Sequence, residues 1–522
     1  MTRPTHPSHR SGPGGIGRRS VLMALAATPL AATALANCSP SGSGSDTESD
    51  SGDRISIAML QPPRSGLSPL SDDAFKLSRW STAETLVALD AEGEALPALA
   101  TEWTRDDDLT WTFTIREGVT FHSGNALTVE HVVSSLQSAI DASPVPRILD
   151  GVELTLEAGD GSVTLTTGDP DPLLPHRLSS PQLAILDAGA YTDNGVSPVG
   201  FGTGPFELVA VDGVVGATLD RYEDYWGEPA QASGIDVKFV PDGTARAAAL
   251  RTGEAQVVEA IPAGQAASID EDLIYEVPMP RTNTLYLNTA NGPLTDPALR
   301  AAIREAIDPA AIVESVYEGR ADVAQGLLGP ALAWAAEERS DPAYQEALDA
   351  RPAAADPTGV SLTLGTFTDR AELPEVAVMI EQQLEAAGFE VQQDVREYQF
   401  IEADALDGAF DIFILSRATV LDSGDPVAYL ASDFATGGGF AISQLSSPEV
   451  DEAINLAGVT EAGPERRRAT ILAEAAVLAA DAAIPMLHER VIQGEAATAL
   501  DAARDPRERL LITAETRLDA AQ

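Results

Sequence analysis

The chain has 522 residues, 44% apolar and 22% charged, a composition typical of soluble globular proteins with two or three domains. Its 80 acidic and 33 basic residues give a net charge of −47, which argues against a nucleic acid partner because phosphate binding requires clustered cations. The single cysteine excludes an internal disulfide framework and a cysteine-rich zinc or iron–sulfur site.

The first residues have the pattern of an export signal. Residues 1–19 contain arginines and no acid, and residues 21–36 form a mostly apolar run that is shorter than the roughly 20 residues of a membrane span. The pair Arg18-Arg19 ahead of this run resembles a twin-arginine signal. The sequence therefore predicts a signal peptide over residues 1–37 and an exported protein.

Cys38 stands at the end of the apolar run, after Leu-Ala-Asn. This pattern resembles a lipobox, in which the cysteine becomes the lipidated first residue after cleavage, although Asn37 replaces the usual small residue. Residues 38–53 are rich in Ser, Gly and Asp, as expected for a flexible tether. We therefore expect a globule anchored through Cys38 to the outer face of the cell membrane, on its periplasmic or cell-wall side.

The rest of the chain alternates predicted strands and helices. Residues 110–115 (TWTFTI) alternate polar and apolar side chains, which indicates a half-buried strand, and 373–387 has the apolar spacing of an amphipathic helix that ends at Gly388. In the N-terminal half of the chain the residue patterns predict the following elements, in order: a strand at 54–60; over 82–104 an amphipathic helix, then a turn at 92–93, then a second short segment; a strand at 110–115; a helix at 128–140; a hairpin of 152–156 with 163–167; strands at 206–211, 218–220 and 236–240; and a helix at 244–252. The second part predicts a strand at 285–288, a helix at 297–307, surface helices and loops over 309–358, a strand at 361–366, the helix at 373–387, strands at 390–395 and 410–415, a helix at 465–482 and a strand at 489–493. This alternation predicts α/β layers with at least two cores.

The residues of the mature chain contain no recognisable catalytic pattern. Its four histidines, His122, His131, His176 and His488, include no pair at the i, i+4 spacing of a helical metal site. We find no phosphate-binding loop, and the nearest match to a serine nucleophile elbow lies in the Gly-Ser tether. We therefore assign no catalytic residue, metal ligand or cofactor. An exported hydrolase that uses paired carboxylates remains an alternative, because such pairs cannot be identified among 80 acids.

Several blocks, in order along the chain, resemble one known family. They are 96–103 (LPALATEW), 108–124 (DLTWTFTIREGVTFHSG), 202–206 (GTGPF), 221–227 (RYEDYWG), 242–254, 286–288 (YLN) and 300–308. This set is similar to the solute-binding proteins of ABC importers, specifically the peptide/nickel-type family 5. The glycines and aromatic residues of 202–206 and 221–227 are interpreted as turn and core residues rather than ligand contacts.

The resemblance implies a two-lobed α/β periplasmic-binding-protein fold of type II, with an extra subdomain and a ligand cleft between lobes that close by hinge motion. It places lobe I at 54–279, lobe II at 280–488, and a return to lobe I at 489–522. It also implies delivery of the solute to a membrane permease and ATPase complex, by a protein that we expect to be a monomer.

Three residues are predicted to contact the solute. The family's peptide binders use an acid to hold the peptide ammonium group, in an Asp-x-Gly-Asp-Pro pattern that stands here at 422–426 and points to Asp422. Arg370 lies in the loop where some dipeptide binders carry an arginine for the peptide carboxylate. Arg417 is an unusual residue for its position in the family, and it favours a solute that is anionic or that differs in shape from a dipeptide. Thr419 occupies the place of an expected aromatic residue.

Short peptides are therefore the expected solute. The alternatives are a metal–chelate complex, such as nickel with a small organic chelator, and an oligosaccharide, which would need several aromatic side chains in the cleft. A receptor-type protein of the same fold without a closed cleft is a further alternative outside transport.

Overall fold

The computed structural model describes residues 53–192, 195–420 and 423–519. The predicted signal peptide, Cys38, almost all of the tether and Asp422 lie outside these ranges. None of the helices in the described ranges has the length and apolar character needed to cross a bilayer.

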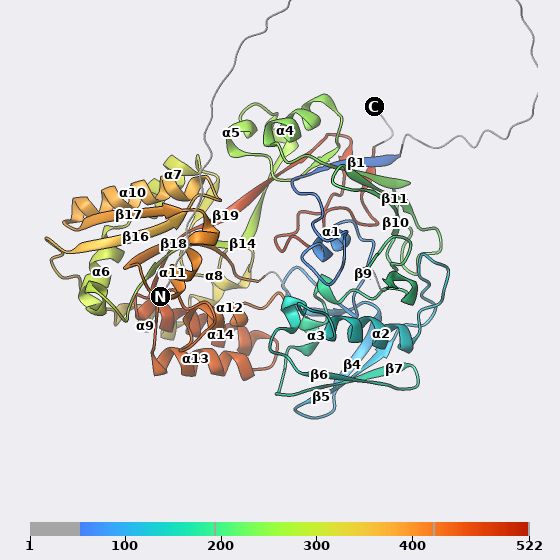
Figure 1. Ribbon diagram of the computed structural model, residues 1–522, viewed down its shortest axis with the longest axis horizontal. Helices are drawn as coiled ribbons and strands as arrows, with labels where there is room; N and C mark the ends of the chain where they lie inside the picture. Colours follow the sequence, from blue (N-terminus) through green and yellow to red (C-terminus); the bar gives the residue numbers. More distant parts are fainter. Residues whose placement is uncertain (1–52, 193–194, 421–422, 520–522) are drawn as a thin grey trace, which may run out of the picture. The chain divides into compact units, whose positions relative to one another are not determined.

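Eleven strands of the described chain form one mixed sheet, in the order β10-β11-β12-β1-β13-β19-β14-β18-β16-β17, with β15 paired to β19 (Figure 1). They are β1 Arg54–Met59, β10 Phe206–Asp212, β11 Gly216–Arg221, β12 Gly234–Phe239, β13 Val257–Val258, β14 Ile274–Leu287, β15 Ala321–Val323, β16 Ser361–Phe367, β17 Glu390–Arg396, β18 Ile412–Ala418 and β19 Ala483–Glu495. The two longest, β14 and β19, are antiparallel neighbours in the middle of the sheet. They connect the strands of the N-terminal half to β18, β16 and β17.

A second layer is the four-stranded antiparallel sheet β4-β5-β7-β6, against which α2 packs (Figure 1). Its strands are β4 Ala100–Arg105, β5 Thr110–Ile115, β6 Leu154–Ala158 and β7 Ser162–Thr167. The alternation predicted for TWTFTI is confirmed, because Trp111, Phe113 and Ile115 are buried while the threonines between them are partly exposed. Three short hairpins complete the strands: β2 Val87–Leu89 with β3 Ala95–Pro97, β8 Tyr191–Thr192 with β9 Gly195–Val196, and β20 Ala499–Leu500 with β21 Arg517–Leu518.

The helices cover the sheets on several sides. They are α1 Ala74–Arg79, α2 Val129–Ile140, α3 Leu174–Arg177, α4 Gly243–Thr252, α5 Ala263–Ala266, α6 Pro297–Ala306, α7 Pro309–Val316, α8 Trp334–Glu338, α9 Pro342–Asp349, α10 Glu372–Ala387, α11 Glu402–Leu406, α12 Val427–Phe434, α13 Pro448–Val459 and α14 Pro464–Ala479. The predicted helix at 373–387 is α10, which connects the parallel strands β16 and β17. Its apolar stripe is buried, and the helix ends at Gly388 in the left-handed conformation that glycine adopts readily.

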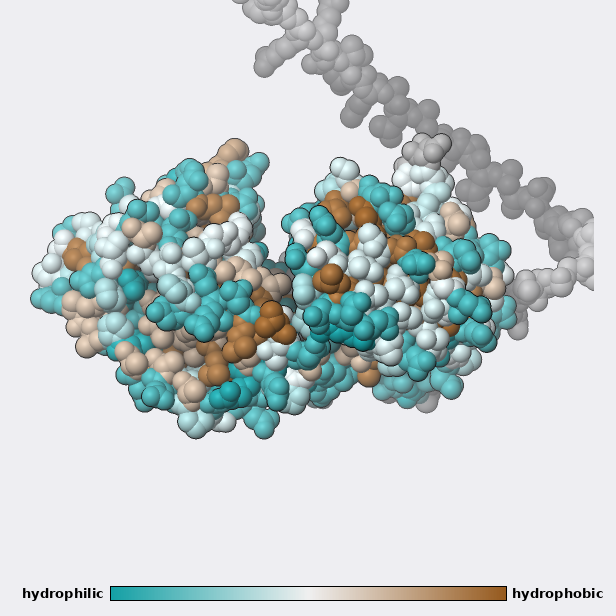
Figure 2. All heavy atoms as spheres, turned by 90° about the horizontal axis from the view of Figure 1, so that it is seen from below, coloured by the Kyte–Doolittle hydropathy of each residue, from teal (hydrophilic) through white to brown (hydrophobic). Residues whose placement is uncertain are grey.

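The buried apolar residues form separate cores. The largest lies between 285 and 487, where β14, β16 and β18 meet α10, α12 and α14. A second core surrounds β1, β11 and β12, and a third lies between α2 and the four-stranded sheet. On the face drawn in Figure 2, strongly hydrophobic residues form separate patches among hydrophilic ones, as is usual for a protein surface.

The prediction of a helix beginning at residue 82 was wrong. The segment 82–104 instead contains the hairpin β2–β3, with Gly93 at its turn in the left-handed region, and most of β4. Apolar spacing favoured a helix, but β4 pairs with β5 and so takes an extended conformation that local spacing does not reveal.

Close backbone packing explains the glycines of the GTGPF block. A methyl group on Gly204 would lie 2.0 Å from the carbonyl oxygen of Ser81, and one on Gly202 would lie 2.0 Å from that of Thr82. No Cβ atom can approach an oxygen so closely, and neither oxygen belongs to a side chain that could rotate away. These glycines therefore allow the two backbone segments to touch, which supports a structural role.

Two aromatic residues of the RYEDYWG block, Tyr225 and Trp226, cover the partly buried carboxylate of Glu84. The Tyr225 hydroxyl donates a hydrogen bond of 2.9 Å to Glu84 Oε1, and the Trp226 indole N–H donates one of 2.9 Å to Glu84 Oε2. Arg116 stacks on the Trp226 ring at 4.3 Å. Burial raises the pKa of Glu84, and these two donors stabilise its carboxylate in place of water.

We expect Gly204→Ala to lower the free energy of unfolding by about 1–3 kcal/mol, since the added methyl group forces two backbone segments apart. Gly264→Ala is the matched control, because a Cβ atom there meets nothing within 4 Å. Urea unfolding of both variants measures the difference. Equal stabilities would contradict the close-packing interpretation.

Candidate functional site

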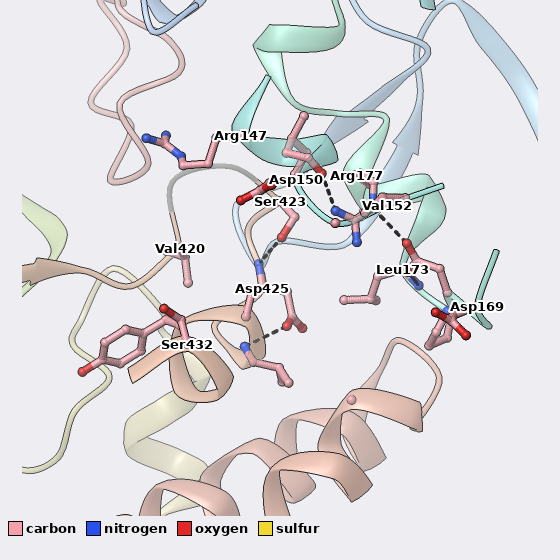
Figure 3. A pocket seen from close by; sticks show the side chains of 18 of the residues that line it. Arg147, Asp150, Val152, Asp169, Leu173, Arg177, Val420, Ser423, Asp425 and Ser432 are labelled. Carbon is pink, nitrogen blue, oxygen red and sulfur yellow. Dashed lines mark hydrogen bonds and ion pairs between the residues drawn. The ribbon is translucent and has the colours of Figure 1, made fainter. Parts of the chain in front are cut away.

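A pocket of about 750 Å³, here called pocket A, lies between the four-stranded sheet and the C-terminal helices (Figure 3). One wall is formed by loops of residues 147–153 and 167–177. The other is formed by the end of β18, by α12 and by Arg466 of α14. Residues from both halves of the described chain therefore line one space.

Arg177 holds the two loops of the first wall together. Its Nε donates a hydrogen bond of 2.9 Å to Asp171 Oδ2, and another nitrogen donates to the carbonyl oxygen of Ile148. Asp171 also accepts the backbone N–H of Leu173 at 2.9 Å. These bonds fix the two segments, which contain only short helical turns, at 147–149 and at α3.

The same wall carries carboxylates that no cation neutralises. Asp150, Glu153 and Asp169 are exposed, and their side chains have no ion-pair or hydrogen-bond partner among the described residues. Figure 3 shows Asp150 and Asp169 on this wall. This part of pocket A can therefore attract a cationic group of a ligand.

On the opposite wall, Asp425 has a structural role. Its carboxylate accepts a hydrogen bond of 2.7 Å from Nε of Arg466 and one of 2.9 Å from the backbone N–H of Val427, in the first turn of α12. Arg466 also donates to the carbonyl oxygens of Ala457 and Thr460 at 2.6 Å each. The second acid of the Asp-x-Gly-Asp-Pro pattern thus links the start of α12 to α14.

Arg417 lines pocket A but is paired with a buried acid. Its Nε and Nη2 donate to the two oxygens of Asp433, at 3.0 and 2.9 Å, and its guanidinium stacks on Phe440 at 4.1 Å. The Asp433 side chain is fully buried and also accepts the Tyr286 hydroxyl at 3.0 Å. Burial opposes the charge on Arg417, but Asp433 outweighs this effect and raises the pKa of the guanidinium. The ion pair of Arg417 with Asp433 is neutral as a whole, so Arg417 presents polar N–H groups to the pocket but adds no net charge to it.

A second space of about 750 Å³, pocket B, contains the other predicted arginine. It is lined by α1 and the end of β1, by residues of β14 and β19, and by the C-terminal end of α7. Arg370 donates to Glu372 at 2.7 Å, to the Ser416 hydroxyl at 3.1 Å and to Glu489 at 2.6 Å. The two carboxylates overcome the effect of burial and raise the pKa of Arg370.

Arg370 and Arg417 therefore line different pockets. Arg370 contacts Ser416, the residue before Arg417 in β18, and successive side chains of a strand point to opposite faces. Arg417 lies opposite Thr282, whereas the neighbouring pair is Arg281 with Ala418. Because successive side chains of a strand point to opposite faces, Arg417 and Arg281 leave the sheet on opposite sides, toward pockets A and B. Sequence analysis missed Arg281 and the acids of pocket A, because no local pattern distinguishes them from surface charges.

Two buried histidines take no part in either pocket. His122 donates from Nε2 to the Gly204 carbonyl oxygen at 2.9 Å, and His488 bonds Thr282 Oγ1 through Nδ1 at 2.9 Å. Burial lowers the pKa of each from its ordinary 6.5 to about 4. Among the described residues, no group of three or more His, Cys, Asp or Glu side chains could hold a metal ion.

Comparison with known proteins identifies the family. The sequence profile described as "Bacterial extracellular solute-binding proteins, family 5 Middle" matches residues 94–440. The chain belongs to this family. This match confirms the family predicted from the sequence. Family 5 proteins bind small solutes outside the cytoplasm and work with ABC transporters.

Two curated relatives illustrate the range of family 5. Nickel-binding protein NikA of Staphylococcus aureus is 23% identical over 420 residues, which cover 79% of this chain and 84% of NikA. Glutathione-binding protein GsiB of Escherichia coli is 30% identical over 321 residues, which cover 59% of this chain and 62% of GsiB.

Solved structures show the same fold. A nickel ABC transporter protein of Bacillus halodurans matches with a TM-score of 0.76 and 24% identity, covering 89% of this chain and 100% of that one. DppA of Helicobacter pylori, in complex with the peptide STSA, matches with a TM-score of 0.66 and 21% identity, covering 89% and 98%. The two-lobed periplasmic-binding-protein fold predicted from the sequence is thereby confirmed.

We expect Asp433→Asn to lower the free energy of unfolding by about 2 kcal/mol, because it leaves Arg417 without its buried counter-charge. Adding Arg417→Gln should recover part of this loss in a double-mutant cycle. Asp394→Asn is the control, since its pair with Arg396 is half-exposed on both sides and should cost less than about 1 kcal/mol. Additive losses at 417 and 433 would contradict the coupling.

The burial of His122 and His488 predicts that the free energy of unfolding depends on pH. Between about pH 6.5 and pH 4 the unfolded chain binds protons at His122 and His488 that the folded protein does not, so stability falls as the pH falls through this window. At roughly 1.4 kcal/mol per pKa unit, each contributes a loss on the order of 3 kcal/mol at the acid end. We expect His122→Gln to show a shallower decline than the wild type in unfolding experiments between pH 7 and pH 4. An unchanged slope would mean that His122 titrates normally.

Proposed function

We propose that this family 5 protein captures short peptides outside the cell membrane and delivers them to the permease and ATPase of an ABC importer. The observation that carries the proposal is the distribution of charge around pocket A. In pocket A the acids Asp150, Glu153 and Asp169 have no ion-pair partner among the described residues, whereas the pocket's arginines are each paired with a carboxylate: Arg147, Arg177, Arg417 and Arg466. A peptide carries an ammonium group that such a wall attracts, together with backbone donors and acceptors that suit polar walls.

The lining of the pockets favours peptides over sugars. Tyr429 is the aromatic residue among the described residues that line pocket A, and Phe75 and Tyr317 are those of pocket B. Sugar binding generally requires larger aromatic surfaces for stacking. An oligosaccharide is therefore the weaker alternative.

A metal–chelate complex is the second candidate, favoured by the likeness to NikA. The described residues offer no cluster of metal ligands, so any metal would have to arrive with its own chelator. Nickel with a small carboxylate chelator is the form to test.

We further propose that residues 1–37 direct export, that Cys38 is lipidated, and that 38–53 tether the globule to the outer face of the membrane. This rests on the sequence pattern. We assign lobe I to 54–279 with the return at 489–522, and lobe II to 280–488. The confinement of the largest apolar core to residues between 285 and 487 supports this division.

The first experiment is native mass spectrometry of the chain without residues 1–37, carrying Cys38→Ser, purified from a peptide-containing lysate. We expect a population heavier by the mass of a short peptide, released on denaturation and identified by sequencing. A protein that stays unshifted with peptide mixtures but binds a nickel chelate would replace the peptide by the second candidate.

We retain Asp422 as the proposed partner of the peptide ammonium group, on the family pattern. Asp422→Ala should weaken peptide binding by about 2–5 kcal/mol, because it removes the counter-charge of a desolvated cation. Titration calorimetry with a peptide and its N-acetylated form provides the control, since the acetylated form lacks the charge and should not distinguish variant from wild type. Unchanged binding of the free peptide would remove Asp422 from the site.

A further inference from the structure

Three consecutive arginines stand near the start of α14, in a chain with 80 acidic and 33 basic residues. Successive positions of an α-helix point about 100° apart, so Arg466, Arg467 and Arg468 leave the helix in three directions. Arg466 pairs with Asp425 at 2.7 Å and Arg468 pairs with Asp341 at 2.6 Å. Both acids belong to the segment assigned above to lobe II, so these two pairs fix α14 within its own lobe.

Arg467 differs from its two neighbours because it reaches into the segment assigned to lobe I. Its guanidinium pairs with Glu94, in the turn of the β2–β3 hairpin, and the two side chains are only 23% and 37% exposed. The hairpin holds Glu94 in place, since the backbone N–H of this residue donates a hydrogen bond of 2.8 Å to Asp90 Oδ1. An ion pair between two positioned side chains therefore crosses from one lobe to the other.

A second ion pair crosses between the lobes with the opposite polarity. Arg105, at the end of β4, pairs with Glu461 in the turn between α13 and α14. The arginine is fixed on its own side, because Nε and Nη2 donate to the carbonyl oxygens of Asp107 at 3.2 Å and Asp108 at 3.0 Å. Each lobe thus contributes one acid and one arginine, so the two pairs match only when the surfaces meet in one register.

Close packing joins the same two surfaces. A Cβ atom on Gly424 would lie 2.7 Å from Cδ1 of Leu89 in β2, and the φ of +74° at Gly424 is one that glycine adopts readily. The space left beside this contact is a cavity of about 40 Å³, lined by 92–94 and His176 on one side and by 424–426 and Arg467 on the other. Gly424 belongs to the Asp-x-Gly-Asp-Pro pattern, so the contact adjoins the proposed ammonium site along the chain.

We propose that the two ion pairs and the Gly424 contact form a clasp that holds the lobes closed and slows release of the solute. The proposal rests on the proposed peptide function and on the division into lobes. The ladder of β14 with β19 joins the lobes through backbone hydrogen bonds, and it lies above α13 and α14 in Figure 1. The clasp joins them through ion pairs and packing, so it can open while the ladder stays intact. Its residues position the lobes.

The first test measures the distance between the lobes, with and without trialanine. The chain without residues 1–37 and with Cys38→Ser carries spin labels at Asp160→Cys and Asn455→Cys, two exposed positions in lobes I and II. Double electron–electron resonance gives the distribution of distances between the labels. Arg467→Gln should move part of the population to longer distances, because the ion pair with Glu94 is lost.

Arg468→Gln is the matched control, because it removes the same charge one residue along α14 but from a pair inside lobe II. It should leave the distances unchanged. The charge swap Glu94→Arg with Arg467→Glu restores an ion pair and should return the wild-type distances, which a merely local disturbance of α14 would not allow. If Arg467→Gln shifts no distance in either state, if Arg468→Gln opens the lobes as much, or if the swap fails to close them, the clasp is wrong.

The second test measures the release of trialanine by stopped-flow fluorescence. Arg467→Gln should raise the dissociation rate constant about 2- to 5-fold, as expected for the loss of one partly exposed ion pair, and Arg468→Gln should not. Between 0.01 M and 1 M NaCl the Debye length falls from about 30 Å to about 3 Å. The wild-type dissociation rate should therefore rise with salt, and by a larger factor than that of Arg467→Gln.

Failure of the clasp and failure of the peptide function have different signatures. If wild type does not bind trialanine, the proposed peptide function is contradicted, and the label distances without solute decide the clasp. If the distances shift but trialanine leaves Arg467→Gln at the wild-type rate, the contact closes the lobes without retaining the solute. That outcome overturns the role of the clasp in solute release.

Discussion

The antiparallel ladder of β14 with β19 is the constraint on which the rest of the structure depends. Strand β14 pairs with β18 along its other edge, and β19 pairs with β13 and β15. The strands of the N-terminal half and those of the largest core are therefore joined in one sheet by backbone hydrogen bonds. Because both strands are long and pair over most of their length, the positions of their side chains are fixed relative to each other.

The alternation of side chains along these strands divides the site into two chemical environments. Arg417 leaves the β14–β18 pair on one face and meets the buried Asp433, whereas Arg281 leaves it on the other face and meets no carboxylate. Adjacent positions in the same ladder thus give one neutralised and one available guanidinium. Unneutralised acids therefore lie in pocket A and an unneutralised cation in pocket B, on the opposite face of the β14–β18 pair.

Buried charge in this acidic protein is satisfied by an ion pair or by backbone hydrogen bonds, the latter at Arg246, which donates to four carbonyl oxygens. Glu474 is fully buried, yet it accepts two bonds from Arg339, one from the Tyr344 hydroxyl at 3.0 Å and one from the Leu328 N–H at 2.8 Å. Leaving such a carboxylate unpaired would cost several kcal/mol. Arginines such as Arg339 therefore neutralise interior acids, whereas Arg246 satisfies backbone carbonyl oxygens.

The sequence by itself determined the elements whose signals are local. The alternation of TWTFTI identified β5, the apolar stripe before Gly388 identified α10, and ordered blocks such as GTGPF identified the family and with it the two-lobed fold. It did not determine the length of β14, where two prolines suggest a break and the pairing with β19 nevertheless continues across bulges. Nor did it separate Arg370 and Arg417 into different pockets or single out Arg281. Those outcomes depend on strands that pair across 125 to 220 residues of chain, from Leu287↔Ile412 to Ile274↔Gly494, and only the tertiary structure decides which charges then meet.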